Sequence, residues 1–244
     1  MSLLADLLQD VNTDAPVRSV LVGSHWVVVC SRSCGMASAL HGDHNHGRPE
    51  VRDAGRLHVK SAADLLELGH SESMLEASIG VATLNALLEV DESRAVELNA
   101  AEVLAARGKD RKVALVGHFP FISSLRAAVG QLWVLEQHPV EGEYPAEAAA
   151  ELIPRADLVA ITGTALINGT LDSLLGFCQS GATVMVLGPS TPLSPVLFDY
   201  GVDILSGTRV VDEDAVLRTV AQGASFRQVE GVRLLTFTRE KGGL

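Results

Sequence analysis

Short runs of apolar residues alternate with helix-like stretches throughout the second half of this chain, from Lys112 onward. The apolar runs are rich in Val, Ile and Leu, a composition typical of strands that are buried on both faces of a parallel sheet. They occupy residues 113–116, 132–135, 158–161, 183–187 and 202–205. The helix-like stretches occupy residues 121–129, 146–152, 170–178, 195–200 and 212–222. This alternation predicts βαβ units and a Rossmann-like parallel sheet.

The first hundred residues follow a different rhythm. Two β-rich runs, residues 17–22 and 26–30, are separated by a Gly-Ser pair and predict a hairpin. Helical patterns follow, among them one for which Asn99 is a typical cap. We therefore place a boundary near residue 105. It divides the chain into a smaller α+β domain, residues 1–105, and an α/β domain, residues 106–244.

Each predicted parallel strand is followed directly by small or polar residues. The carboxyl ends of parallel strands meet at one edge of a sheet, and ligands bind at that edge, so five such turns predict a binding crevice. Glycines there let a ligand approach the backbone, and hydroxyls near helix starts lie where free N–H groups favour anions. The candidate ligand-binding residues at this edge are Phe119, Thr162, Gly163, Thr164, Asn168, Thr170, Gly188, Pro189, Ser190 and Thr191. Taken alone, Thr170 is a helix cap; a phosphate or carboxylate on the 168–171 turn is the alternative.

Three further residues could contribute to this crevice. His118 follows the first parallel strand, and an imidazole in a cleft can act as acid, base or metal ligand. Glu136 could pair with His118 or bind a cation, or it could be a solvated residue at a strand end. Asn85 is unusual inside an apolar helix. We expect it to fix the contact between the domains or to reach the ligand.

A short segment before residue 50 is rich in metal-binding side chains. Its candidate metal ligands are His41, Asp43, His44 and His46. Imidazoles and carboxylates coordinate Zn, Ni, Cu or Co, so the segment predicts a transition metal. The spacing matches no closed structural zinc motif, and a polar loop rich in turn formers is the alternative.

The phosphate-binding motifs of common nucleotide sites are missing. No GxGxxG follows the first parallel strand, where Gly117 precedes His, Phe and Pro. The sequence also has no GxxxxGK[ST] motif. Ordinary NAD binding and P-loop ATP hydrolysis are thereby disfavoured.

The composition of the chain limits the classes of partner that it can bind. The 244 residues carry a formal net charge of −11, and their scattered Lys and Arg lack the basic stripe of a nucleic-acid-binding protein.

No apolar run approaches the roughly 20 residues needed to span a bilayer, and the first residues lack the basic region of a signal peptide. Cys30, Cys34 and Cys178 are a sparse set that favours a reducing cytosol over a disulfide framework. We expect a cytoplasmic protein that binds neither nucleic acid nor membrane. The small residues of segment 77–86 could pack within the chain or across a homodimer.

Several segments form a recognisable set when taken together. They are Val22-Gly23 to Trp26, Ser78-Ile79-Gly80 to Asn85-Ala86-Leu87, His118-Phe119-Pro120, Thr162-Gly163-Thr164 with Asn168-Gly169-Thr170, Gly188-Pro189-Ser190-Thr191-Pro192, and GTRVVDED from Gly207. In this set the chain resembles the putative heavy-metal chelation family, whose members join an enolase-N-terminal-like domain to a Rossmann-like domain. The resemblance covers nearly the whole chain. It implies a site between the two domains and a role in handling heavy metals or metal chelates.

The sequence leaves three functions open. The first is the binding of a small anionic or metal-chelating molecule in the cleft between the domains. The second is an enzyme on the same site, with His118 as general acid or base acting on a nucleotide-like or chelator substrate. The third is a metal carrier that works through residues 41–46. Fold analogy alone does not choose among them.

Overall fold

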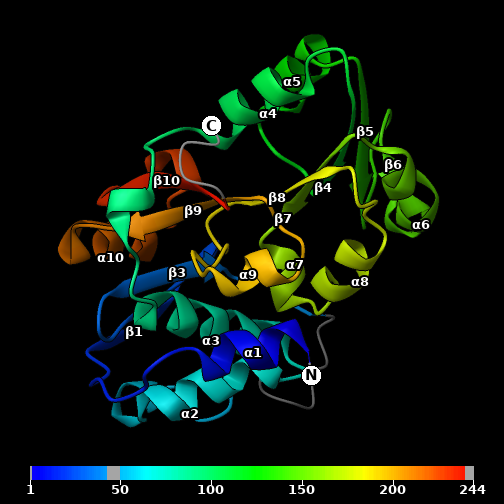
Figure 1. Ribbon diagram of the computed structural model, residues 1–244. Helices are drawn as coiled ribbons and strands as arrows, with labels where there is room; N and C mark the ends of the chain where they lie inside the picture. Colours follow the sequence, from blue (N-terminus) through cyan, green and yellow to red (C-terminus); the bar gives the residue numbers. More distant parts are fainter. Residues whose placement is uncertain (1, 43–49, 240–244) are drawn as a thin grey trace.

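The chain folds around two β-sheets (Figure 1) in a computed structural model that describes residues 2–42 and 50–239. The smaller sheet is antiparallel and has the order β1-β2-β3, with β1 (Ser19–Val22), β2 (Trp26–Cys30) and β3 (Cys34–Ser38). The larger sheet has the order β10-β9-β8-β7-β4-β5-β6. Its strands are β4 (Lys112–Val116), β5 (Gln131–Glu136), β6 (Tyr144–Pro145), β7 (Leu158–Thr162), β8 (Thr183–Leu187), β9 (Ile204–Val210) and β10 (Val232–Thr238). All pairings in it are parallel except that of β10 with β9.

The predicted α/β class and the predicted hairpin are therefore confirmed. The five expected parallel strands correspond to β4, β5, β7, β8 and β9. The fifth begins at Ile204, two residues later than expected, and continues to Val210. The sequence pattern does not predict the edge strands β6 and β10, because β6 has only two residues and β10 contains Arg and Thr among its apolar positions.

Helices cover the sheets and connect their strands. They are α1 (Leu3–Gln9), α2 (Ala62–Leu66), α3 (Met74–Leu87), α4 (Ala100–Gly108), α5 (Ile122–Ala128), α6 (Ala149–Leu152), α7 (Thr164–Ile167), α8 (Leu171–Gly176), α9 (Val196–Asp199) and α10 (Glu213–Ala221). Side-chain caps fix several of their starts. The Asn99 side chain accepts a hydrogen bond from the Ala101 amide at the start of α4, as predicted.

The central helix α3 is buried along nearly its whole length. A Cβ atom on Gly80 would lie 2.1 Å from the backbone nitrogen of Gly69, and one on Gly35 in β3 would lie 2.3 Å from the carbonyl oxygen of Ala82. Only glycine permits such close contact between backbones. The small residues of α3 therefore pack within the chain, which is one of the two alternatives that the sequence left open.

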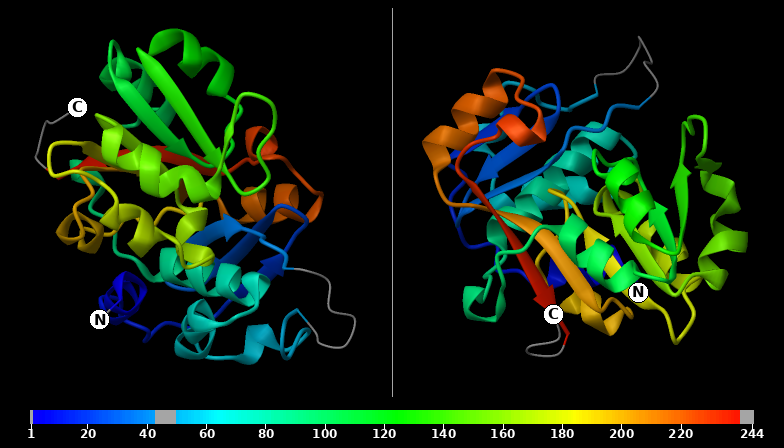
Figure 2. Two further views of the ribbon diagram at one scale, coloured as in Figure 1. Left: turned by 90° about the vertical axis from the view of Figure 1, so that its right-hand side faces the viewer. Right: turned by 90° about the horizontal axis from the view of Figure 1, so that it is seen from above.

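The two sheets share one apolar core. A single cluster of buried residues includes Leu3 of α1 and Val27 of β2 together with Val159 of β7. Helix α10, from the end of the chain, packs against β1 and β2 (Figure 2, orange against blue). Helix α1 lies near α9, where the Tyr200 hydroxyl donates a hydrogen bond to the Asp6 carboxylate at 2.5 Å. Both ends of the chain thus help to hold the two sheets together.

The topology of the large sheet creates a place for a ligand. The chain enters at β4, moves outward to β5 and β6, and then returns to the other side of β4 at β7. The carboxyl ends of β4 and β7 flank the point at which the strand order reverses. In open α/β sheets, ligands bind at such a point.

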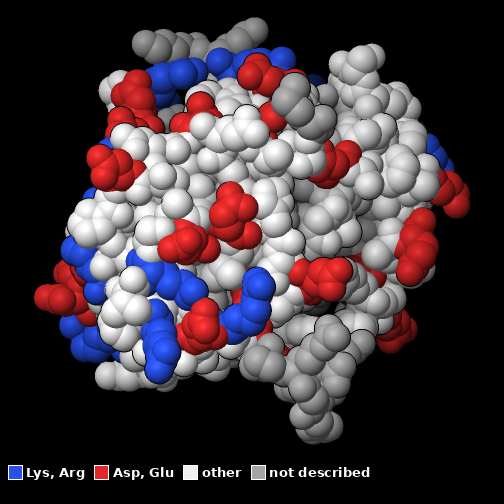
Figure 3. All heavy atoms as spheres, turned by 90° about the horizontal axis from the view of Figure 1, so that it is seen from below, with Lys and Arg blue, Asp and Glu red and all other residues white. Residues whose placement is uncertain are grey.

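Charge is unevenly distributed on the face shown in Figure 3. Basic side chains gather at its left and top, the right half carries mainly acidic ones, and wide uncharged areas lie between. No described helix has both the length and the apolar character that crossing a membrane requires.

Candidate functional site

A large cleft opens at the carboxyl edge of the large sheet. Its volume is about 1200 Å³, somewhat above the roughly 300–1,000 Å³ of typical ligand pockets. The loops after β4, β5, β7 and β8 line it from one side. Residues 206–208, predicted as a turn after the fifth strand, instead lie within β9 and also line the cleft. The ends of β2 and β3 in the small sheet line it from the other, through residues 24–26 and 38–40. The crevice predicted from the strand ends is thus a cleft between the two sheets.

Two glycines shape the floor of this cleft. Gly117 directly follows β4 and Gly188 directly follows β8, and both have a φ of 107°. This conformation is open to glycine and strained for other residues. Each glycine turns the chain sharply at the strand end, and the side chain of Phe119 lies near both of them. The same local geometry therefore recurs on two strands of one edge.

His118 faces this region together with a carboxylate that the sequence did not single out. The His118 Nδ1 atom lies 2.7 Å from Oε1 of Glu143, in the loop between β5 and β6. The Glu143 side chain is only 4% exposed, whereas that of His118 is 59% exposed. The other Glu143 oxygen accepts a hydrogen bond from the Val140 amide at 3.1 Å. A buried carboxylate thus orients an accessible imidazole, an arrangement used for metal ligands and for general acid–base groups.

Pairing with His118 is one of the roles that the sequence leaves open for Glu136, and in the structure His118 pairs with Glu143 instead. Glu136 lines the cleft, but its Oε1 accepts a hydrogen bond from the neighbouring Gln137 amide at 3.2 Å. Glu143 lies 25 residues from His118 in the sequence, on a loop with no regular pattern. Only a tertiary contact could identify it.

One further cation lines the cleft. Arg227 is exposed in a short 3-10 helix, Phe226–Gln228, between α10 and β10. Within residues 2–42 and 50–239 its guanidinium makes no hydrogen bond or ion pair. Arginine in a largely apolar cleft is suited to a carboxylate or phosphate. No sequence motif marked this residue.

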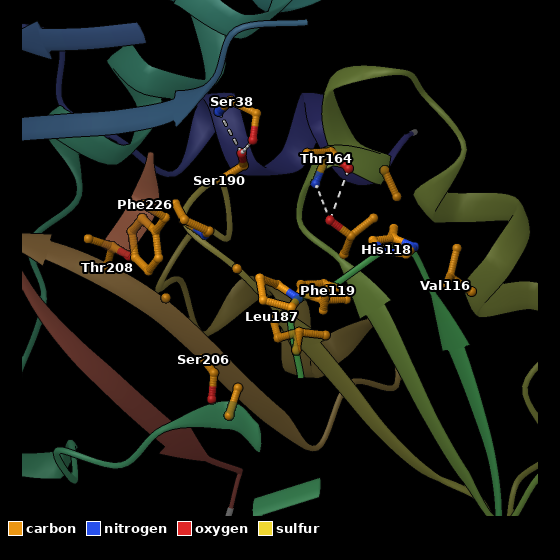
Figure 4. A pocket seen from close by; sticks show the side chains of 18 of the residues that line it. Ser38, Val116, His118, Phe119, Thr164, Leu187, Ser190, Ser206, Thr208 and Phe226 are labelled. Atoms are coloured by element: carbon orange, nitrogen blue, oxygen red, sulfur yellow. Dashed lines mark hydrogen bonds between the residues drawn. The ribbon is translucent and has the colours of Figure 1, made fainter. Parts of the chain in front are cut away.

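Aromatic side chains form two walls. Phe119 and Phe121 are stacked with ring centroids 5.1 Å apart, and Trp26 and Phe226 are tilted with centroids 5.5 Å apart. All four line the cleft, and Figure 4 shows Phe119 and Phe226 reaching it from different elements. Such walls bury the apolar or planar part of a ligand.

The hydroxyls predicted to bind a ligand are largely engaged with one another. The hydroxyls of Thr162 and Thr164 lie 2.9 Å apart. The Ser190 hydroxyl accepts a hydrogen bond from the Ser38 amide at 2.9 Å and thereby joins the two sheets (Figure 4). In contrast, Oγ1 of Thr208, on β9, is buried without a hydrogen-bond partner. A ligand that enters the cleft could satisfy it.

Thr170 does not act as a helix cap. Its hydroxyl donates a hydrogen bond to Oδ1 of Asn168 at 2.7 Å, and its side chain makes no cap to α8. The interpretation as a side-chain cap is therefore wrong, because the Thr170 hydroxyl is hydrogen-bonded to the side-chain oxygen of Asn168 instead of to α8. Both residues line the cleft.

Three predicted ligand-binding residues lie behind the cleft wall. Asn85 donates to the carbonyl oxygens of Met36 and Ser190, at 3.0 and 3.4 Å, and so connects α3 to both sheets. A Cβ atom on Gly163 would lie 2.6 Å from the Thr191 nitrogen, so these two residues pack against each other. Asn85, Gly163 and Thr191 do not line the cavity. The other predicted ligand-binding residues do line it: Phe119, Thr162, Thr164, Asn168, Thr170, Gly188, Pro189 and Ser190.

The predicted metal-binding segment is only partly within the described residues. His41 places Nδ1 3.0 Å from a Glu50 carboxylate oxygen. Asp43, His44 and His46 lie outside the described residues.

The cysteines differ from the expectation. A disulfide joins Cys30 and Cys34, whereas Cys178 is a free thiol. The sequence favoured a reducing environment over disulfides, and this expectation is wrong for the first two cysteines because the β2–β3 hairpin places them directly opposite each other. Within the described part of the chain, the one group of three or more potential metal ligands is formed by Cys30, Cys34 and Glu213.

Two family models match this chain. A model described as putative heavy-metal chelation matches residues 99–239, and a second model with the same description matches residues 4–88. Together they cover both sheets.

Individual proteins resemble the chain over different lengths. An uncharacterized protein of Methanocaldococcus jannaschii is 28% identical over 165 residues, which is 65% of this chain and 64% of that protein. The matched region thus spans less than two thirds of that relative. A crystal structure from Desulfitobacterium hafniense, of a family member with unknown function, superposes with a TM-score of 0.84 and 26% identity, covering 97% of each chain. A second one, from Pyrococcus horikoshii, has a TM-score of 0.84 at 18% identity and covers 97% of this chain and 100% of that one, which shows the same fold.

Proposed function

Because the chain belongs to the family described as putative heavy-metal chelation, we propose that its cleft binds a small anionic molecule that itself chelates a metal ion. The metal is then cargo, and the chelator supplies most of its ligands. The division of the chain near residue 105 into an enolase-N-terminal-like and a Rossmann-like domain, with the site between them, is part of this proposal.

One observation carries it. Among the described residues, the cleft presents His118 backed by Glu143 but no three converging ligand atoms. A naked transition-metal ion needs about four ligands in a closed site. A chelate brings its own donors, so a single oriented imidazole is enough to complete its coordination sphere.

The other cleft groups fit the organic part of such a ligand. Arg227 is available to pair with a carboxylate. The aromatic walls around Phe119 and Trp26 can bury its apolar part.

Calorimetric titration tests this proposal. The protein is titrated with Ni²⁺ alone, with citrate and other polycarboxylate or amino-carboxylate chelators alone, and with the Ni²⁺ complexes of these chelators. We expect a complex to bind more tightly than either component. Arg227→Ala should weaken the binding of both chelator and complex at least about tenfold, and His118→Ala should weaken only the complex. Arg218→Ala is the matched control, because Arg218 lies outside the cleft and pairs with Glu230 at 2.9 Å. Binding of free Ni²⁺ as tightly as any complex would contradict the proposal.

An acid–base enzyme on the same cleft is the second candidate. The contact between His118 and Glu143 favours it, because a carboxylate that fixes an imidazole also prepares it for proton transfer. Turnover of a chelator or nucleotide-like compound that stops in His118→Gln, with binding retained, would select this function. The carrier function through residues 41–46 is separated from both by deleting residues 43–46, since only a carrier loses all metal affinity.

A further inference from the structure

A second chemically unusual site lies at the opposite end of the small sheet from the cleft. Cys30 ends β2 and Cys34 begins β3, and their Cα atoms are 4.0 Å apart across a three-residue turn. Both side chains are buried, with 0% and 6% exposure. The cleft contacts the other end of the same hairpin, at Trp26 and Ser38. Four residues of strand, about 13 Å, separate the two places.

Two charged side chains meet at this disulfide. Arg18 precedes β1, and its Nη2 atom lies 3.9 Å from the Cys34 sulfur. The same nitrogen lies 2.7 Å from a carboxylate oxygen of Glu213, the first residue of α10. The two sulfurs and a Glu213 oxygen all lie within 4.8 Å of one another. Glu213, which is 195 residues from Arg18 in the sequence, therefore meets Arg18 and the β2–β3 hairpin at one point.

The disulfide adds little to the hairpin that contains it. A crosslink stabilises by restricting the unfolded chain, and this effect is smallest for short loops. Here the closed loop contains only residues 31–33, and the β2–β3 pairing already aligns the two cysteines. Because the disulfide adds little stability, we attribute the position of Arg18 and Glu213 beside the sulfurs to the chemistry of the two cysteines.

We propose that Cys30, Cys34 and Glu213 form a metal site that opens when the disulfide is reduced, and that it takes a thiophilic divalent ion such as Zn²⁺ or Cd²⁺. A dithiol reductant supplies two electrons and two protons. The S–S bond breaks, Cys30 and Cys34 become thiols, and the reductant is oxidised to its own disulfide. The ion then binds the two sulfurs as thiolates, and their two protons pass to the solvent.

The charges and the geometry suit this ion. Two thiolates and one carboxylate carry three negative charges, which a divalent cation and Arg18 neutralise together. A cation beside a sulfur also favours its thiolate form. In a tetrahedral zinc site the ligand atoms lie roughly 3.5–4 Å apart. The two sulfurs must therefore move apart once the S–S bond is broken, whereas a Glu213 oxygen already lies within 4.8 Å of both. A carboxylate has two oxygens, so Glu213 can bind the ion with one and keep Arg18 with the other, which leaves the fourth position open to water or an exchanging ligand.

The test compares Cd²⁺ binding by the disulfide and the dithiol forms of the unaltered protein. The protein is reduced with dithiothreitol, desalted without oxygen, and titrated with CdCl₂ while the ultraviolet thiolate-to-metal charge-transfer band is followed. We expect the reduced form to show this band with one Cd²⁺ per chain, and the oxidised form to show none. Cys34→Ser should lower the affinity of the reduced form at least about 100-fold, and Glu213→Gln about tenfold with the band retained.

Two matched variants separate this site from others. Cys178→Ser removes the remaining free thiol, whose pKa is raised to about 11 by burial and by Asp203. Glu230→Gln alters another exposed glutamate that pairs with an arginine. Both should bind Cd²⁺ like the parent. Equal Cd²⁺ binding by the two redox forms, loss of the band in Cys178→Ser, or tight binding retained in Cys34→Ser would overturn the proposal. Loss of circular dichroism on reduction of the parent would also overturn it, because the disulfide would then be structural.

Discussion

The His118 imidazole and the Glu143 carboxylate lie 2.7 Å apart, although 25 residues separate them in the sequence. Glu143 is buried and His118 is accessible, so the carboxylate fixes the ring while the other ring nitrogen remains available to a ligand. In the proposed function this pair is the chemical centre of the cleft, and the role of Glu143 can be tested apart from that of His118.

Replacing Glu143 with Gln should weaken binding of a Ni²⁺ chelate by about 10–100-fold, the usual effect of losing a carboxylate that orients a metal-binding histidine. The matched control is Glu141→Gln, two residues away and exposed. Calorimetric titration measures both variants. If they bind equally well, Glu143 does not position His118.

Replacing Ser190 with Ala should destabilise the fold. Its hydroxyl accepts from the Ser38 amide at 2.9 Å, and the variant leaves this amide without that partner between the sheets. The expected cost is about 1–3 kcal/mol, or a fall in Tm of roughly 2–10 °C. Ser173→Ala, at an exposed serine that lines the same cleft, is the control and should leave the Tm nearly unchanged. An unaltered Tm in Ser190→Ala, measured by calorimetry, would show that Ser190 does not hold the sheets together.

Replacing Gly80 with Ala should lower the free energy of unfolding by about 1–3 kcal/mol or more, because the added methyl group overpacks a filled interface. Its Cβ would lie 2.1 Å from the Gly69 backbone nitrogen. Gly176→Ala is the comparison, since a Cβ there meets nothing within 4 Å. That variant should be neutral or stabilising by up to about 1 kcal/mol. Urea unfolding measures the free energy of unfolding of both variants. A Gly80→Ala variant as stable as the parent would mean that α3 does not pack tightly against the Gly69 backbone.

The contact between Tyr200 and Asp6 predicts a loss of stability at high pH. The hydrogen bond to Asp6, followed by burial, raises the pKa of Tyr200 from 10.0 to about 12. A pKa that is higher in the folded state stabilises the fold when the phenol is protonated. The contribution is therefore complete below pH 10 and disappears as the pH rises toward 12.

We expect the difference in Tm between the parent and Tyr200→Phe to be constant from pH 8 to about pH 9.5 and to shrink above about pH 10. Thermal unfolding across this range measures it. A difference that does not change up to pH 11.5 would argue against the hydrogen bond.

The sequence by itself determined the parts of this protein that depend on local patterns. Apolar runs marked the five main parallel strands, because strands buried on both faces must be apolar along their length. Asn99 marked the start of α4, because its side chain satisfies an amide only two residues away. The polar residues after four of those strands, β4, β5, β7 and β8, marked the cleft, since parallel strands bring their carboxyl ends to one edge.

Only the tertiary structure decided which of those residues face the cleft and which hold the protein together. Ser190 and Asn85 connect the sheets, because the small sheet presents the Ser38 amide and the Met36 carbonyl oxygen to them. Glu143 contacts His118, and Arg227 lines the cleft, from segments without any periodic pattern. The hairpin register sets Cys30 opposite Cys34. Each of these contacts joins groups that are brought together by the packing of whole elements. Hydrophobic periodicity and capping act over a few residues and carry no information about such partners.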